Sequence, residues 1–557
     1  ASLFKTVSLR SGGGQVARAM GGILVEPDSR DPLRRRLRHV VEEIALASGV
    51  PVPEVYVLER EPGINAFAAG YAPADAAVAV TRGALEKLSR NELQGVIAHE
   101  FSHILNGDMR INIRLMGALF GILLLALIGR RILIHSHFVG RSRDRNGAAL
   151  VLIAFGLTAV GYIGLFFGRW IKAAVSRQRE YLADASAVQF TRDPDGVGGA
   201  LKKIAVYSDA SYLQADSEEI GHMLFGSGRK AFMLATHPPL NERIRRIDPG
   251  FRPEDLEQLA ARIQRDQLRE QEEAADDSDT AAATRGPFDA RRIIEGIGQG
   301  EVQQVLAAAV LVASIPAELT RAARSVNWAP EVLFYLLLDA DDRRREQQLL
   351  IVAQQMGADS EARVRALAAA GSQVAAEQRL PLLEMALPAL KRRPTEFVAR
   401  VLEAAEAMAA VDQRTDMFEF LTARLIAQFI AEAADPAAVR LAGSRSLQAC
   451  RDDALSVLSI LAQSGHDTPS GAEAAFEAGM KQLNFSADLA RPAADDWVRI
   501  LDEALPRLDA LKPRHKETLV RALISAALHD GEVRPAEREL LRAVCGLLHV
   551  PLPILSS

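Results

Sequence analysis

The spacing of apolar residues predicts a mainly helical chain with a short β-region near its start. Apolar positions in residues 32–48 recur every three to four residues, which is the period of an amphipathic helix. Residues 55–58 and 77–80 are short apolar runs separated by a stretch rich in Gly and Pro, so they predict strands. A capping box formed by Ser89 and Glu92 predicts that another helix begins there, and Asn106-Gly107 predicts its end.

Two longer apolar stretches predict a transmembrane helical hairpin at about residues 111–169. Residues 115–129 and 148–168 contain no charged side chain. The second stretch reaches the roughly 20 residues that a helix needs to cross a bilayer, whereas the first is only marginally long enough. The alternative is a buried hairpin within a soluble domain.

Composition favours several domains in a reducing compartment. The chain of 557 residues is too long for one ordinary core, and its two cysteines cannot form a disulfide framework. The formal net charge of -5, without a basic stripe, gives no indication of nucleic-acid binding. We expect an N-terminal membrane-proximal segment, a first domain that contains the hairpin, an acidic linker, and an all-α C-terminal domain, over residues 1–29, 30–265, 266–287 and 288–557 respectively.

The C-terminal domain contains a weak repeat in which an Asp is followed seven residues later by a Glu that opens the next helix. Asp412 with Glu419 and Asp530 with Glu537 show it best. We interpret the repeat as helix–turn–helix units with carboxylates at helix N-termini, because the alternating ligands of a calcium loop are missing. No metal-ligand or nucleophile pattern is evident after residue 250. The end of the chain, at about residues 512–557, resembles a TerB-like helical module.

The strongest chemical signal is the sequence His99-Glu100-Phe101-Ser102-His103, an HExxH motif on a predicted helix. Residues four positions apart share one helix face, so both imidazoles can bind one metal ion. Glu100 lies beside the first ligand and can act as general base toward an attacking water.

A third ligand is predicted on a later helix by the sequence RExxAD at residues 179–184. A catalytic zinc ion needs three protein ligands and an open fourth position, and Glu180 supplies the missing carboxylate. Asp184 lies one turn further on, where it can accept a hydrogen bond from a ligand histidine. The hairpin lies between the two motifs, and two membrane crossings would return the chain to the side of His99.

These motifs resemble the HtpX-like and CAAX prenyl protease family of integral-membrane zinc metallopeptidases. The resemblance covers residues 30–250 and includes INAFAAG at 64–70, VTRGAL at 80–85, AHEFSHILNGD at 98–108 and THPPLNERIRRI at 236–247. It implies a gluzincin-type domain with one Zn²⁺ held by His99, His103 and Glu180, and with Glu100 as the catalytic base.

The resemblance also implies how substrate is bound. Asn65, Ala66 and Phe67 would lie on an edge strand that pairs with the substrate backbone, and His237 would stabilise the oxyanion. Arg243 is a further candidate for the same cleft. From the residues alone, Asn65 is an ordinary turn residue and His237 a loop residue.

The predicted function is hydrolysis of peptide bonds in membrane or misfolded proteins by a metal-activated water. The resemblance places the protein in a bacterial inner membrane as a multi-pass protein, with the active site and the C-terminal domain in the cytoplasm. Its partners would be polypeptide substrates, the lipid bilayer, and a protein partner or a second copy bound through the helical domain. The alternatives are an inactive membrane-anchored scaffold and a soluble metalloprotease.

Overall fold

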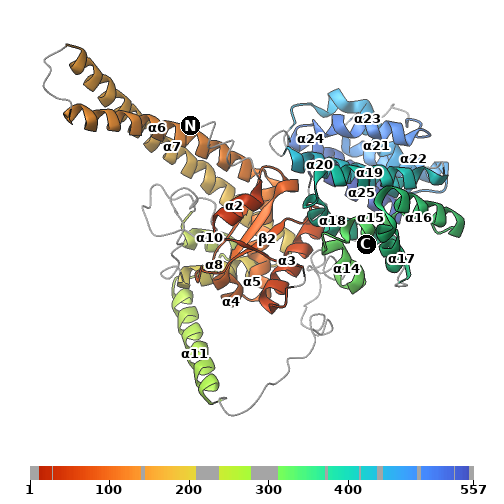
Figure 1. The fold of residues 1–557 in the computed structure, drawn as a ribbon, viewed down its shortest axis with the longest axis horizontal. Coiled ribbons are helices and arrows are strands. Elements are labelled where there is room, and N and C mark those ends of the chain that lie inside the picture. The colour runs from red at the N-terminus through yellow and green to blue at the C-terminus, as the bar shows by residue number, and fades with distance from the viewer. Residues whose placement is uncertain are drawn as a thin grey trace.

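The chain was studied as a computed structural model. The structure describes residues 12–27, 29–138, 145–207, 238–276, 311–369, 374–412, 416–435, 443–483, 491–531 and 533–550, together with residues 439 and 485. It is mainly helical with one small sheet, as the sequence predicts. The sheet and the helices around it form one unit, and a separate group of helices lies beside it (Figure 1).

Four strands form the sheet in the order β1-β2-β4-β3. They are β1 (Ile23–Leu24), β2 (Glu54–Leu58), β3 (Ala66–Ala69) and β4 (Ala77–Thr81). β2 and β4 run parallel, whereas β1 and β3 pair antiparallel with their neighbours. Both strands predicted from apolar runs are therefore confirmed, and β3 is an edge strand.

The two faces of the sheet are covered by different helices. Ala66 and Ala68 of β3 belong to the large core beneath α3 (Pro32–Ser48) and α5 (Arg90–Leu105). Phe67 belongs to a smaller core on the other face, against α2 (Gly13–Ala19). This alternation follows from the two-residue period of a strand.

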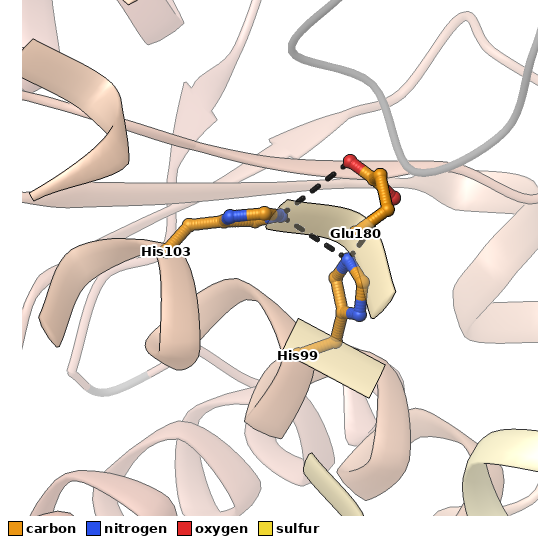
Figure 2. Close-up of side chains that lie close together, drawn as sticks. All are labelled: His99, His103 and Glu180. Carbon is orange, nitrogen blue, oxygen red and sulfur yellow. Dashed lines mark hydrogen bonds and ion pairs between the residues drawn. The ribbon is translucent and has the colours of Figure 1, made fainter. Parts of the chain in front are cut away.

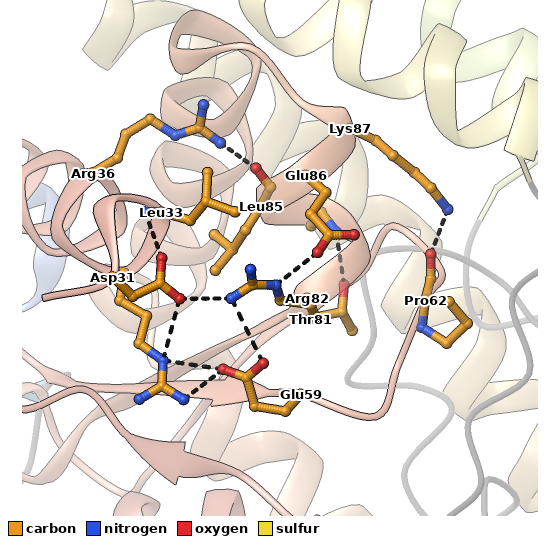
Figure 3. A network of polar contacts seen from close by, with 12 residues as sticks. Asp31, Leu33, Arg36, Glu59, Pro62, Thr81, Arg82, Leu85, Glu86 and Lys87 are labelled. Atoms are coloured by element: carbon orange, nitrogen blue, oxygen red, sulfur yellow. Dashed lines mark hydrogen bonds and ion pairs between the residues drawn. The ribbon is translucent and has the colours of Figure 1, made fainter. Parts of the chain in front are cut away.

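Polar contacts anchor the short helix α4 (Arg82–Lys87), which follows β4 (Figure 3). Thr81 caps this helix by accepting a hydrogen bond from the Ala84 N–H. Arg82 pairs with Asp31, the N-cap residue of α3, at 2.7 Å, and with Glu59 at 3.7 Å. The VTRGAL motif thus ties the end of the sheet to the start of α3.

A long helical hairpin projects from this unit (Figure 1). It consists of α6 (Asp108–Phe138) and α7 (Arg145–Thr191). The helices pack so closely that a Cβ atom on Gly161 would come within 2.6 Å of the Ala126 backbone nitrogen. The predicted hairpin is therefore confirmed as a pair of helices.

The prediction that this hairpin crosses a membrane is not confirmed. Within the part of the chain that the structure describes, every helix falls short of the length and apolar character that a membrane span requires. In α6, Arg130 and Arg131 interrupt the apolar side chains that the structure describes.

Three further helices belong to this unit in the part of the chain that the structure describes: α8 (Pro194–Tyr207), α10 (Leu240–Ile247) and α11 (Glu254–Asp276). α11 extends into the segment 266–287 that we predicted to be a linker. The first part of this segment, residues 266–276, is helical. It is rich in Gln, Glu, Arg and Ala, which have high helix propensity.

The C-terminal region consists of helices around two hydrophobic cores. They are α14 (Ala317–Arg324), α15 (Ala329–Leu336), α16 (Asp342–Met356), α17 (Ala358–Ala369), α18 (Ala376–Lys391), α19 (Thr395–Ala409), α20 (Met417–Ala434), α21 (Arg451–Ser464), α22 (Pro469–Leu483), α23 (Trp497–Asp509), α24 (Pro513–Ala527) and α25 (Pro535–Leu547). We refer to this region as the helical domain.

The helical domain packs directly on the sheet-containing unit. Ala74, in the 3-10 turn η2 (Pro73–Asp75) between β3 and β4, is part of one core of the helical domain. Lys391 at the end of α18 donates a hydrogen bond to the Ala74 carbonyl at 3.0 Å. Arg324 forms an ion pair with the buried Glu42 of α3.

Candidate metal centre

Helix α5 positions the HExxH residues. The predicted capping box is present, since Ser89 accepts from the Glu92 N–H and Glu92 accepts from the Ser89 N–H. His99 and Glu100 are buried at 1% and 2% exposure, while the His103 side chain is 17% exposed. The helix therefore presents both imidazoles on one side, in an environment with little access to water.

Helix α7 brings Glu180 to these two histidines. The Nε2 atoms of His99 and His103 lie 3.2 Å apart. The Glu180 carboxylate lies 3.6 Å from His99 Nε2 and 3.7 Å from His103 Nε2. Figure 2 shows the three side chains pointing toward one another. The structure thus brings together the three residues that the sequence singled out, as a group that could hold a metal ion.

Asp184 contacts the Nδ1 atom of His99, and Arg243 in turn contacts Asp184. His99 Nδ1 lies 3.0 Å from Asp184 Oδ1, as expected from the one-turn spacing of Asp184 and Glu180. Arg243, on α10, donates two hydrogen bonds of 2.8 and 2.7 Å to the Asp184 carboxylate and lies 3.4 Å from Glu180. Arg243 is fully buried against these two carboxylates, and its place in the substrate cleft stays a prediction.

Asp108 supports the second histidine, and sequence reasoning missed it. Its Oδ2 atom lies 2.8 Å from His103 Nδ1, and Arg179 of α7 forms an ion pair with its other oxygen. Asp108 is 3% exposed and opens α6. Its position at the end of the AHEFSHILNGD motif, five residues after His103, was the available signal.

Burial and neighbouring charges shift the pKa values of the site in different directions. Burial alone would lower the pKa of His99, but the Asp184 and Glu180 carboxylates raise it to about 9. Burial would raise the pKa of Asp184, but Arg243 lowers it to about 2. Burial raises the pKa of Glu100, in spite of the nearby histidines. Asp184 therefore stays ionised, whereas Glu100 is adjusted toward proton transfer.

Glu100 also contacts the edge strand. The backbone N–H of Ala68 lies near its carboxylate and acts to lower the pKa of Glu100, against the larger effect of burial. Ala66 and Ala68 lie on the α5 side of the sheet, and Phe67 points to the α2 side. Asn65 comes just before β3, is 3% exposed, and pairs with Thr81 through its backbone at 2.9 and 3.0 Å. His237 lies outside the described residues.

The donor set fits a catalytic zinc ion. Two imidazoles and one carboxylate converge, which leaves a fourth coordination position for water. Each imidazole has a carboxylate at Nδ1, which keeps Nε2 as the atom that can bind metal. The two imidazoles are therefore already oriented to bind a metal ion through Nε2.

Comparison with known proteins gives one consistent result. The model of peptidase family M48 matches residues 32–249. A protein named Protease HtpX homolog from Caldanaerobacter subterraneus subsp. tengcongensis is 41% identical over 220 residues, which cover 38% of this chain and 70% of the relative. Proteins of the same name from Listeria monocytogenes serotype 4a and Streptococcus uberis are 41% and 37% identical, and each is covered over 71% of its length.

No solved structure matches the chain. The matched family region contains every residue of the metal centre, and the helical domain lies beyond it. The chain belongs to peptidase family M48 and is a metallopeptidase similar to the HtpX proteases.

Proposed function

We propose that the protein is a membrane-bound zinc endopeptidase. The observation that carries this proposal is the convergence of His99, His103 and Glu180, with an aspartate behind each histidine. Two histidines and one glutamate are the ligand set of a catalytic zinc site. A purely structural zinc site would instead be closed by four protein ligands.

We infer that Glu100 is the general base. When bound, zinc would supply a Lewis acid that activates water and polarises the scissile carbonyl. Glu100 would take the proton from the attacking water and transfer it to the leaving amine. Its burial next to both histidines, and the raised pKa that follows, suit this exchange.

We propose that substrate pairs with β3. In the part of the chain that the structure describes, β3 is bonded to β4 on one side and to no strand on the other. An extended peptide can add to such an edge through main-chain hydrogen bonds. Ala66 would act through its backbone, whereas the N–H and C=O groups of Asn65 are already paired with Thr81. The side chain of Phe67 points to the opposite face, and the substrate roles of Asn65 and Phe67 stay predictions from the family resemblance. The oxyanion role of His237 stays a prediction from the family resemblance.

We also propose that the hairpin inserts into the inner membrane of a bacterium. Among the side chains that the structure describes, most of the exposed large apolar ones lie on α6 and α7, including Leu152 at 73%, Val160 at 67% and Phe155 at 63% exposure. An apolar surface of this kind on a projecting element is typical of a membrane or protein contact. The family resemblance places the metal centre on the cytoplasmic side.

Two variants test the catalytic proposal. Glu100→Gln should keep the zinc content of the wild type and lose hydrolysis of an unstructured peptide, because the ligands remain and the base is removed. His103→Ala should lose the catalytic zinc as well as activity. Equal zinc loss in both variants would contradict the assigned roles. Full zinc content without hydrolysis in the wild type, over a wide range of peptides, would favour the inactive scaffold.

A liposome flotation assay tests the membrane proposal. The wild-type protein should float with vesicles of anionic bacterial lipids, and a variant with Leu152→Glu, Phe155→Glu and Val160→Glu should stay in the dense fraction. A matched control changes the exposed Leu350 of the helical domain, at 59% exposure, to Glu. Equal flotation of the triple variant and the wild type would refute insertion through α7.

A further inference from the structure

A second group of metal-binding side chains lies in the helical domain, away from the peptidase site. His466 follows the C-terminal end of α21, while His529 and Asp530 lie in the turn between α24 and α25. One donor atom from each of the three lies within 4.8 Å of the others. The expectation that no ligand set follows residue 250 was therefore wrong, because the fold joins residues from distant turns.

The His466 ring is oriented as in a metal ligand. Its Nδ1 atom lies 3.0 Å from the Ala462 carbonyl oxygen, which can only accept, so Nδ1 carries the proton. In the neutral ring, Nε2 then presents a lone pair. This atom is buried, makes no hydrogen bond with a described residue, and lies 3.5 Å from Asp530 Oδ2. Ligand histidines are commonly fixed in this way, through a carbonyl on the other ring nitrogen.

The buried carboxyl group of Glu537 lies next to His466. Glu537 is 1% exposed and uses Oε2 to accept the Arg534 N–H at 3.0 Å, at the start of α25. Its Oε1 is buried and has no hydrogen-bond partner in the described part of the chain. This oxygen occupies the space where a Cβ atom on Gly465 would lie.

We propose that His466, His529 and Asp530 form a second site, which binds a divalent transition metal ion such as Zn²⁺. Two imidazoles with a carboxylate suit zinc and its neighbours, whereas Ca²⁺ and Mg²⁺ prefer oxygen ligands only. Ligand atoms at 2.0–2.1 Å in tetrahedral geometry lie about 3.3 Å apart. The 3.5 Å between His466 Nε2 and Asp530 Oδ2 is close to this separation.

Such an ion would join the end of α21 to the α24–α25 turn. α21, α24 and α25 all contribute to the same hydrophobic core of the helical domain. His529 and Asp530 are exposed, so the ion can enter from solvent without opening the fold. Because the ligands meet only in the native fold, binding should stabilise that fold. The site would therefore fix the helical domain and take no part in peptide hydrolysis.

Zinc counting on the full-length protein in detergent tests the proposal. The protein is stripped with a chelator, dialysed against Zn²⁺ at low free concentration, and its metal content measured by mass spectrometry. We expect two zinc ions per wild-type chain, one in His103→Ala, one in His529→Gln, and none in the double variant. His529 is exposed, so His529→Gln should fold normally. The matched control is Asp467→Asn, which changes a neighbouring exposed carboxylate at 86% exposure and should keep both ions.

Two results would overturn the proposal. The first is a single zinc ion in the wild type that disappears completely in His103→Ala. The second is displacement of the second ion by millimolar Ca²⁺, which would indicate an oxygen-only site. Cobalt substitution in His103→Ala gives an independent readout, since four-coordinate Co²⁺ with nitrogen ligands has a strong visible absorption. That band should be present in His103→Ala and absent after adding His529→Gln, with peptidase activity absent in both.

Discussion

Asp184 contacts both Arg243 and the zinc ligand His99. Mutations at Asp184 and Arg243 can therefore distinguish an effect on zinc affinity from an effect on the stability of the fold. Arg243 is fully buried and is neutralised by two hydrogen bonds to Asp184 and by Glu180 at 3.4 Å. Asp184→Asn keeps an acceptor of similar shape but removes the charge. Breaking a buried ion pair from one side costs about 3–5 kcal/mol. We expect a loss near 3 kcal/mol in the metal-free protein, because Glu180 still faces the guanidinium.

The same substitution should also weaken zinc binding. Asp184 orients His99 through Nδ1, and loss of such a partner typically lowers metal affinity about 10–100-fold. Arg243, no longer neutralised by Asp184, would also compete for the Glu180 carboxylate. Competition with a chromophoric chelator measures the zinc affinity, and denaturant unfolding in excess chelator measures the stability of the metal-free fold.

A second variant distinguishes the two effects. Asp184→Asn with Arg243→Met removes both charges, so most of the lost stability should return while the affinity for zinc stays low. Asp108→Asn is the matched control at the other histidine, where the Arg179 partner is 30% exposed and the stability loss should be smaller. If Asp184→Asn had wild-type affinity and stability, or if both properties recovered together in the double variant, the described roles would be wrong.

Three further changes test other parts of the molecule. Glu180→Ala should lower zinc affinity more than Asp184→Asn does, by well over 100-fold, because a ligand itself is lost; full occupancy at low free zinc would place the third ligand elsewhere. Burial acts to lower the pKa of His549, but Asp509 and Glu432 raise it overall to about 9. Protonated His549 should therefore add on the order of 3 kcal/mol to the free energy of unfolding. This contribution is complete below pH ~6.5 and is lost as the pH rises through about 9. Denaturant midpoints between pH 6 and 10 should show this fall in the wild type and a flat profile in His549→Gln. Lys391→Met removes the hydrogen bond to the β3–β4 turn and should raise KM for an extended peptide more than it lowers kcat; an unchanged KM would count against a role of the helical domain in substrate binding.

Local patterns predicted the elements of the peptidase unit well, because each depends on neighbouring residues. The capping box at Ser89, the strand runs and the helical spacing of His99 and His103 are all properties of short segments. The third ligand could also be predicted, since Glu180 is part of a helical motif with Asp184. Each of these predictions needed only the period of a helix or strand.

Contacts between distant segments were much harder to predict. Nothing in the sequence of α10 shows that Arg243 faces Asp184, so the ion pair between them could not be predicted from that helix alone. Asp108 supports His103 only because α6 starts beside α5. The His466 cluster depends on the meeting of two turns that are far apart in the sequence. In each case the neighbouring sequence is the same whether the polar side chain contacts water or a buried partner, so the sequence does not reveal the contact.

The contact between the two parts of the chain indicates how the helical domain can influence hydrolysis without a catalytic group. β3 lies against α5 near its C-terminal end, where the Ala68 N–H is close to the Glu100 carboxylate. The same end continues into the turn at Ala74, which is enclosed in a core of the helical domain. The buried Asp75 holds this turn by accepting the backbone N–H groups of Tyr71 and Ala72 at 2.8 and 2.5 Å. A shift of the helical domain would therefore move the turn and, with it, the strand on which substrate is proposed to pair, while the metal ligands on α5 and α7 stay in place.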